Sequence, residues 1–179
     1  MKFIATLLLK NIWGFKFEGD FPHEQKKLVI IVAPHTSWLD FPLGLLVKWS
    51  LNFSAHFIGK ASLFKPPFGF IFKWLGGIPV NRDKNNNLVE TVVNLYNERE
   101  KLILGIAPEG TRKKVDKWKT GFYFIAKGAN VPILMIALDV EKRIIRISKP
   151  YITTDDMEKD FVHFQKYFED IKGFQSKLP

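Results

Sequence analysis

Three runs of apolar residues constrain the fold of this chain more than any other feature. The first, LVIIVA at 28–33, is continuous and rich in β-branched residues, and comparable runs occur at 102–107 and 132–138. A strand that is apolar at every position has no face to turn to water, so it must be buried on both faces of a sheet. Weaker strand patterns occur at 55–59 and 143–148, the latter alternating and therefore suited to the edge of a sheet.

Helical periodicities separate these predicted strands. Helices are expected from Ser37 to Trp49, after the Asn cluster at 85–87, from Thr120 to Lys127, and from Asp155 onward. This alternation predicts an α/β fold in which a mostly parallel or mixed central sheet is flanked by helices. The length of 179 residues favours a single domain over 1–179.

The N-terminal stretch has the pattern of an amphipathic helix. Lys2, Thr6 and Lys10 fall on one stripe, and apolar residues fill the other side. The pattern indicates either a helix lying in a membrane surface, over 1–17, or a helix packed on the protein's own core. No apolar stretch approaches the ~18 residues of a membrane-spanning helix. We therefore expect a peripheral protein on the cytoplasmic face of a membrane, and the absence of Cys gives no argument for an oxidising compartment.

The net charge of +9 suggests an anionic partner, such as a membrane, a phosphorylated substrate or a nucleic acid. The basic residues stand singly among aromatic residues, as in FKPPFGFIFKWLGG at 64–77. This interleaving suits a lipid interface, although Phe68, Phe72 and Leu75 could equally form part of the core. No recognisable nucleic-acid motif accompanies the charge, so we expect no nucleic-acid partner.

Chemically capable side chains follow the first strand. His35 stands just beyond it, where open α/β sheets form ligand crevices. Asp40 could orient the His35 ring, or it could cap the next helix together with Ser37 as N-cap. The first alternative requires His35 to lie in the turn before the helix, because residues five apart do not share one helical face. Asp40 would then hold one ring nitrogen protonated and leave the other as a base.

Two further blocks carry polar residues. GGIPVNR ends at Arg82, and APEGTR follows the second buried strand with Glu109, Gly110, Thr111 and Arg112 on a turn. The latter turn could share a sheet edge with His35, and guanidinium groups present a donor fork that suits phosphate. The plainer alternative is a pair of solvated surface arginines and an ordinary turn.

The blocks PHTSWLD, GGIPVNR, APEGTR and VPI, in this order, resemble those of the glycerolipid acyltransferase family, which includes lysophosphatidate and glycerol-3-phosphate acyltransferases. The match spans 35–133 and includes the HX4D motif. The resemblance implies that His35, oriented by Asp40, deprotonates an acceptor hydroxyl, which then attacks the thioester of acyl-CoA or acyl carrier protein. No cofactor is implied beyond this co-substrate, and the histidines show no metal-ligand spacing. A serine nucleophile at Ser37 remains an alternative.

The resemblance also implies the residues that hold the acceptor's phosphate. These are Arg82, Glu109, Gly110, Thr111 and Arg112, with Lys60 as a further candidate; Glu109 is expected to fix Arg112 or the turn. The chain departs from the family pattern at Pro34, Ala107 and the pair Lys113 and Lys114, which border the expected binding side. The acceptor therefore stays open. The alternatives are another lyso-lipid, such as an amino-acid lipid, or a non-catalytic membrane- or anion-binding protein of the same fold.

Overall fold

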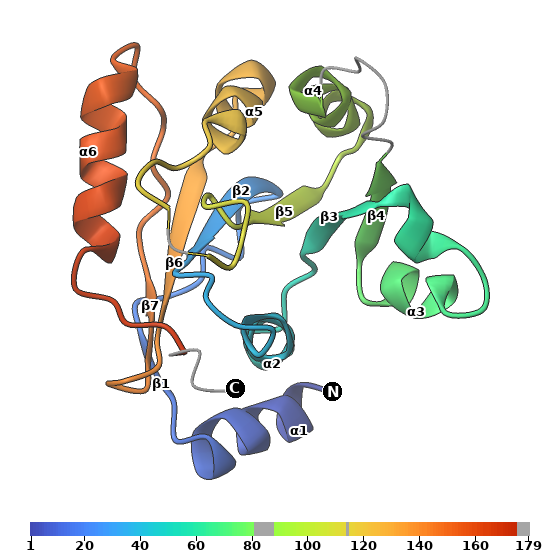
Figure 1. Cartoon of the computed structure of the whole chain (residues 1–179), viewed down its shortest axis with the longest axis vertical. Coiled ribbons are helices and arrows are strands. Elements are labelled where there is room, and N and C mark those ends of the chain that lie inside the picture. The colour runs from blue at the N-terminus through green and yellow to red at the C-terminus, as the bar shows by residue number, and fades with distance from the viewer. Residues whose placement is uncertain (81–87, 114, 175–179) are drawn as a thin grey trace.

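The computed structural model of this chain describes residues 1–80, 88–113 and 115–174 (Figure 1). Within them a seven-stranded sheet has the order β1-β7-β6-β2-β5-β3-β4. The strands are β1 (Lys16–Glu18), β2 (Lys27–Ala33), β3 (His56–Lys60), β4 (Gly77–Val80), β5 (Leu102–Ile106), β6 (Ile133–Asp139) and β7 (Ile144–Ile147). The five strands from β6 to β4 are parallel, and β7 and β1 run in the opposite direction.

Helices cover both faces of the sheet (Figure 1). They are α1 (Lys2–Leu7), a π-helical turn (Leu8–Ile12), α2 (Asp40–Ser50), a 3-10 turn (Ala61–Phe64), α3 (Gly69–Trp74), α4 (Leu88–Glu98), α5 (Gly121–Ala129) and α6 (Met157–Phe168). The helices α4, α5 and α6 lie on one face, α1 and α2 on the other, and α3 beside the β3–β4 edge. This arrangement confirms the predicted α/β fold with a mixed, mostly parallel sheet.

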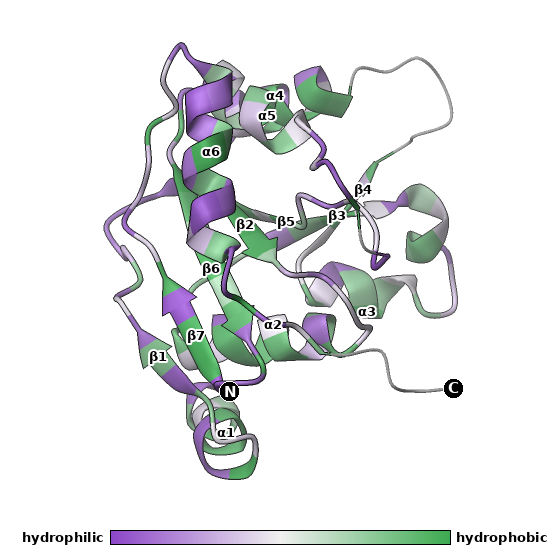
Figure 2. Ribbon diagram, turned by 60° about the vertical axis from the view of Figure 1, so that its left-hand side comes forward, coloured by the Kyte–Doolittle hydropathy of each residue, from purple (hydrophilic) through white to green (hydrophobic). Residues whose placement is uncertain are grey.

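The central strand β2 shows why its apolar run is continuous. Val29 and Ile31 pack toward α4, α5 and α6, whereas Leu28 and Ile30 pack toward α1 and α2. All four are buried, because successive side chains of a strand point to opposite faces and both faces here are covered. In Figure 2, β2 and β6 are predominantly hydrophobic, while the outer side of α6 is hydrophilic.

Two predictions about the elements are wrong. The segment 143–148 does not form the edge of the sheet, because β1 pairs with β7 on that side. β1 has three residues and no apolar run, so periodicity could not reveal it. The helix after β2 begins at Asp40 instead of Ser37, because the Asp40 carboxylate binds the N–H groups of Thr36 and Ser37 and holds a non-helical turn ahead of the helix.

One side of the N-terminal helix packs on the protein's own core, as one of the two alternatives expected, and the other side is exposed. Ala5 and Leu9 are buried, and the Thr6 hydroxyl is hydrogen-bonded to that of Ser50 on α2 at 2.9 Å. Thr6 therefore faces the protein, contrary to the polar stripe predicted for it. The large apolar residues on the other side stay exposed; they are Phe3, Ile4, Leu7 and Ile12. In the described part of the chain, no helix has the length and apolar character needed to cross a membrane.

Candidate active site

The turn between β2 and α2 brings His35 and Asp40 together. The His35 Nδ1 lies 3.1 Å from the Asp40 Oδ2, and that oxygen also accepts the N–H groups of Thr36 and Ser37, each at 2.7 Å. The Asp40 side chain is 5% exposed and that of His35 is 29% exposed. Because an ionised carboxylate can only accept hydrogen bonds, Nδ1 must carry the ring proton. Nε2 is then the basic nitrogen of the ring.

The Asp40 carboxylate thus makes two kinds of contact: it accepts backbone N–H groups before α2, and it lies next to the His35 ring. It binds the Ser37 N–H, as a capping residue does, but Ser37 is not the N-cap that the sequence suggested. The residue before α2 is Leu39, which makes no side-chain cap, and the Ser37 hydroxyl accepts the Leu39 N–H at 3.3 Å. The carboxylate therefore fixes the turn and the ring with the same oxygen.

Glu109 joins the turn after β5 to the turn after β2. Its Oε2 accepts the backbone N–H of His35 at 2.7 Å. Burial raises the pKa of the Glu109 carboxyl above its ordinary value, and the hydrogen bond from His35 opposes this shift. No ion pair joins Glu109 to Arg112, both of which the structure describes. Glu109 therefore binds the backbone of His35 and does not pair with Arg112.

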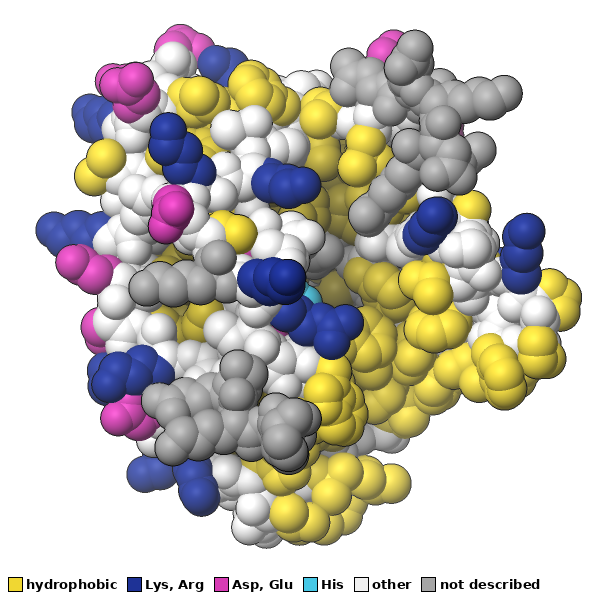
Figure 3. Space-filling view, in the orientation of Figure 1, with side chains coloured by type: hydrophobic (Ala, Val, Ile, Leu, Met, Phe, Trp, Pro, Cys, Tyr) yellow, Lys and Arg dark blue, Asp and Glu magenta, His cyan; other side chains and the backbone are white. Residues whose placement is uncertain are grey.

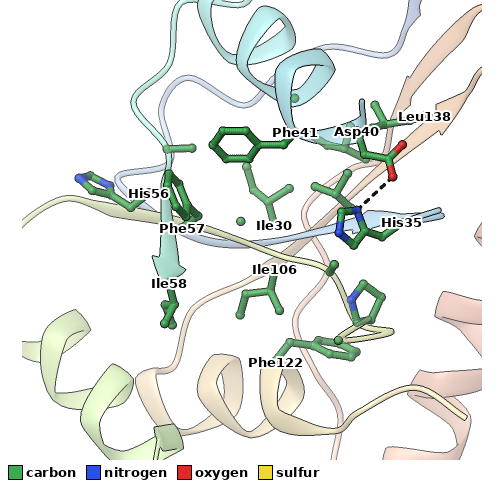
Figure 4. A pocket seen from close by; sticks show the side chains of 18 of the residues that line it. Ile30, His35, Asp40, Phe41, His56, Phe57, Ile58, Ile106, Phe122 and Leu138 are labelled. Atoms are coloured by element: carbon green, nitrogen blue, oxygen red, sulfur yellow. Dashed lines mark ion pairs between the residues drawn. The ribbon is translucent and has the colours of Figure 1, made fainter. Parts of the chain in front are cut away.

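A cleft of about 950 Å³ opens beside His35, at the carboxyl ends of β2 and β5 and along His56–Ile58 of β3. In Figure 3, basic side chains gather on one side of the central hollow and hydrophobic side chains on the other. Figure 4 shows Phe41, Phe57 and Ile106 around the space that the His35 ring faces, with Asp40 on the opposite side of that ring. The cleft can therefore hold an apolar group against the basic nitrogen of His35.

The structure brings most of the predicted site residues to this cleft. Those that line it are His35, Asp40, Gly110, Thr111 and Arg112. Two predicted residues are not among the described residues that line the cleft: Glu109, which binds the backbone of His35, and Lys60, which is exposed at the end of β3. Arg82 lies outside the described residues.

Lys119 is a further cation at the cleft, and no sequence pattern indicated it. It lines the same cleft as Arg112, and its backbone N–H donates to the Pro108 carbonyl at 2.8 Å. Gly110 allows this close approach: it has φ of +67°, and a Cβ there would lie 3.0 Å from the Lys119 Cδ and Cε. Seven positions separate Lys119 from Arg112. Only the folded loop shows that both cations line the same cleft.

Lys48 and His56 also line the cleft and were not predicted to do so. The Lys48 Nζ donates to the carbonyl groups of Ala55 and Leu75, each at 3.0 Å, so it ties α2 to the chain on either side of α3. Burial lowers the pKa values of Lys48 and His56. These contacts give Lys48 a structural role in the cleft wall.

The next feature is the kind of ligand groups that the site offers. Among the described residues, no group of three or more His, Cys, Asp or Glu side chains could hold a metal ion. The chemistry available from the residues described is that of an oriented imidazole, a buried carboxylate and the cations Arg112 and Lys119.

Comparisons with known proteins identify the family and a similar fold. The family model described as "Acyltransferase" matches residues 14–139, which include both turns that carry the site. The fold is similar to that of the 1-acyl-sn-glycerophosphate (LPA) acyltransferase, PlsC, from Thermotoga maritima, with a TM-score of 0.64 and 18% sequence identity over 93% of this chain and 76% of that chain. None of the curated protein sequences compared matches this chain significantly.

Proposed function

This chain belongs to the acyltransferase family, and we propose that it moves a fatty acyl group from acyl-CoA or acyl carrier protein to a hydroxyl of a (lyso)glycerophosphate-type acceptor, as a step of phospholipid synthesis. The observation that carries the proposal is the His35 ring, held by Asp40 at Nδ1 and facing a largely apolar cleft. The likeness to a 1-acyl-sn-glycerophosphate acyltransferase supports the fold that this reaction needs.

In the proposed reaction, the His35 Nε2 takes the proton of the acceptor hydroxyl while that oxygen attacks the thioester carbonyl carbon. The tetrahedral intermediate then collapses, the C–S bond breaks, and the imidazolium returns its proton to the departing thiolate. Asp40 stabilises the imidazolium at the distance already present, 3.1 Å. General-base action of this kind contributes about 10²–10⁴-fold in rate.

The acceptor's phosphate is proposed to lie at the basic side of the cleft. Arg112 and Lys119 both line the cleft from the connection between β5 and α5, and guanidinium and ammonium groups are suitable phosphate ligands. By resemblance to the family, Arg82 is proposed to join them, and Lys60 is retained as a weaker candidate. Gly110 and Thr111 shape the turn that presents Arg112, and Glu109 holds the His35 turn.

An acceptor panel tests the proposed function. Purified protein is incubated with radiolabelled acyl-CoA or acyl carrier protein and with one acceptor at a time: glycerol 3-phosphate, 1-acylglycerol 3-phosphate, an amino-acid lyso-lipid or a monoacylglycerol. We expect labelled product with a phosphate monoester acceptor, and a higher KM for that acceptor in Arg112→Gln than in wild type. Lys117→Gln, on the same loop but outside the cleft lining, is the control.

Two results would count against this assignment. Preference for the phosphate-free monoacylglycerol or for the amino-acid lipid would contradict the role given to Arg112. Failure of every donor and acceptor to give product would favour a non-catalytic protein of the same fold.

Gly44 of α2 offers a prediction about the acyl chain. It lines the cleft, and a Cβ added there would meet nothing within 4 Å. We propose that the acyl chain occupies this space, so Gly44→Phe should shorten the chain that fits. Excluding two methylene groups, at about 0.8 kcal/mol each, lowers kcat/KM for the longest accepted donor roughly 15-fold relative to a shorter one. A series of acyl-CoA chain lengths measures this shift.

Gly44→Ala is the matched control for that experiment, because its methyl group fills little of the space while it also improves helix propensity. It should keep the wild-type order of chain lengths. An unchanged order in Gly44→Phe would show that the acyl chain lies elsewhere.

Two exposed apolar surfaces support a membrane as the partner. One is the α1 surface, defined above by Phe3, Ile4, Leu7 and Ile12. The other, the α3 surface, consists of Leu63, Phe68, Phe70, Ile71 and Trp74, with Lys65 and Lys73 beside them. Phe70 and Trp74 are 69% and 65% exposed. We propose that both surfaces dock on an anionic lipid surface, where the rings enter the headgroup region and the lysines meet phosphate.

Replacing both Phe70 and Trp74 with Asp should weaken vesicle binding. Each side chain contributes roughly 1.5–3 kcal/mol when it is buried in apolar surroundings. The loss of both should therefore lower the partition coefficient between vesicles and water by at least about 100-fold. Sedimentation with vesicles of phosphatidylglycerol and phosphatidylcholine measures it. The control is Val162→Asp, an equally exposed apolar residue on α6. Equal sedimentation of the double variant and wild type would contradict the role of the α3 surface.

A further inference from the structure

The segment that follows α6 touches the catalytic turn. The Thr36 hydroxyl donates a 2.7 Å hydrogen bond to the backbone carbonyl of Phe174, 138 positions further along the chain. The backbone N–H of the same Thr36 donates to the Asp40 Oδ2. Thr36 therefore links the carboxylate that orients His35 to a distant part of the sequence.

A glycine makes this contact possible. A Cβ added at Gly173 would lie 2.5 Å from the Thr36 Oγ1 and 2.9 Å from the Pro34 Cγ. Both distances are shorter than van der Waals contact, so any side chain at this position would push the segment away from the turn. The close approach requires both the hydroxyl of Thr36 and the missing side chain of Gly173.

The segment is anchored on both sides of its contact with Thr36. Ile171 is buried in the core beneath α4, α5 and α6, and the Lys172 carbonyl accepts the Val140 N–H at 2.8 Å. Phe174 packs against the opposite core, edge-on to Trp13 at a centroid distance of 6.4 Å. The segment 171–174 therefore crosses from one core to the other over the catalytic edge of the sheet.

We propose that 171–174 is a strap that positions the catalytic turn, and that Thr36 is a positioning residue for the His35–Asp40 pair. This inference rests on the proposed function. The Asp40 Oδ2 is fixed by the N–H groups of Thr36 and Ser37, so the orientation of the Thr36 peptide sets the direction of the carboxylate and, through it, of the ring. Small errors in such geometry lower the rate of the chemical step.

The strap should affect turnover and leave substrate binding unchanged. Among the described residues that line the cleft, none belongs to 171–174. Thr36→Val keeps the shape of the side chain and removes the donor. We expect kcat to fall about tenfold and the KM values of both substrates to stay within about twofold, because the lost interaction acts on the transition state and not on ground-state binding. Thr36→Ser, which keeps the hydroxyl, should restore kcat.

A double-mutant cycle separates the strap from a general loss of packing. Gly173→Ala should lower kcat about as much as Thr36→Val, although it leaves every side chain of the turn intact. The double variant should be no slower than the slower single variant, because both changes break the same contact. Thr153→Val, on the loop before α6, is the control for the substitution itself and should behave as wild type.

Amide hydrogen exchange tests the strap without reference to activity. The N–H groups of Thr36 and Ser37 are the reporters, because they donate to Asp40. We expect them to exchange about tenfold faster in Thr36→Val and Gly173→Ala, with exchange in β2 unchanged. The strap proposal would be contradicted by unchanged exchange at both amides, or by an unchanged kcat in variants of an active enzyme. If the wild-type protein transfers no acyl group, the proposed function is contradicted. The exchange rates of the two amides then still test the strap proposal.

Discussion

His35→Ala should lower the turnover of acyl transfer by about 10²–10⁴-fold, the usual contribution of a general base. Folding should be nearly unaffected, because Glu109 binds the backbone N–H of His35, which the substitution keeps. Asp40 also retains the N–H groups of Thr36 and Ser37. The KM for the acceptor should change little, since the proposed phosphate contacts come from other residues. Steady-state kinetics and thermal unfolding of the same preparation measure both effects.

His23→Ala is the matched control. His23 is exposed and lies outside the cleft lining, so its loss tests whether removing any histidine slows the protein. It should retain wild-type turnover and stability. If His35→Ala retained more than about a tenth of wild-type turnover, the reaction would not depend on this imidazole as a general base.

Asp40→Asn should have the second largest effect, again about 10²–10⁴-fold in kcat. The amide oxygen can still accept the Thr36 and Ser37 N–H groups, so the turn survives. The variant nevertheless lacks the negative charge that stabilises the imidazolium 3.1 Å away. If the amide turns its NH₂ group toward Nδ1, the ring must change tautomer and Nε2 ceases to be a base.

Comparison with Asp40→Ala separates the chemical role of the carboxylate from its role in the turn. The alanine variant leaves two backbone N–H groups without their acceptor, which costs roughly 1–3 kcal/mol per unsatisfied buried group. It should therefore unfold at a clearly lower temperature than Asp40→Asn, while both are slow. Wild-type kcat in Asp40→Asn would contradict the orienting role of Asp40.

The fold was largely predictable because its central strands carry a strong signal. β2, β5 and β6 are buried on both faces, and burial of this kind requires the apolar runs that the sequence displays. The three-residue β1 carries no such signal, since backbone pairing with Ile144–Arg146 holds it in place. The predicted start of α2 at Ser37 was wrong because Ser37 and Asp40 fit two patterns. They match a capping box, and they also match a turn in which Asp40 binds His35. Only the contact between Asp40 and His35 in the structure decides between these two patterns.

The sequence could indicate the candidate site where its residues are close along the chain. His35 and Asp40 belong to one turn, and the Glu109–Arg112 turn follows a recognisable strand. The contacts that fix these turns are tertiary, and local patterns do not reveal them. Lys119 approaches the cleft through the fold of its own loop, and the bond from Thr36 to Phe174 joins segments 138 positions apart.

The most direct test of the account is the rate of thiol release from acyl-CoA, measured with and without 1-acylglycerol 3-phosphate, in wild type and His35→Ala. We expect release by wild type that depends on the acceptor and matches product formation one to one, and release by His35→Ala that is slower by about 10²–10⁴-fold. A burst of thiol without acceptor would instead indicate an acyl-enzyme, for which Ser37 is the candidate nucleophile. Equal rates in the two proteins would contradict an imidazole base at the centre of the cleft.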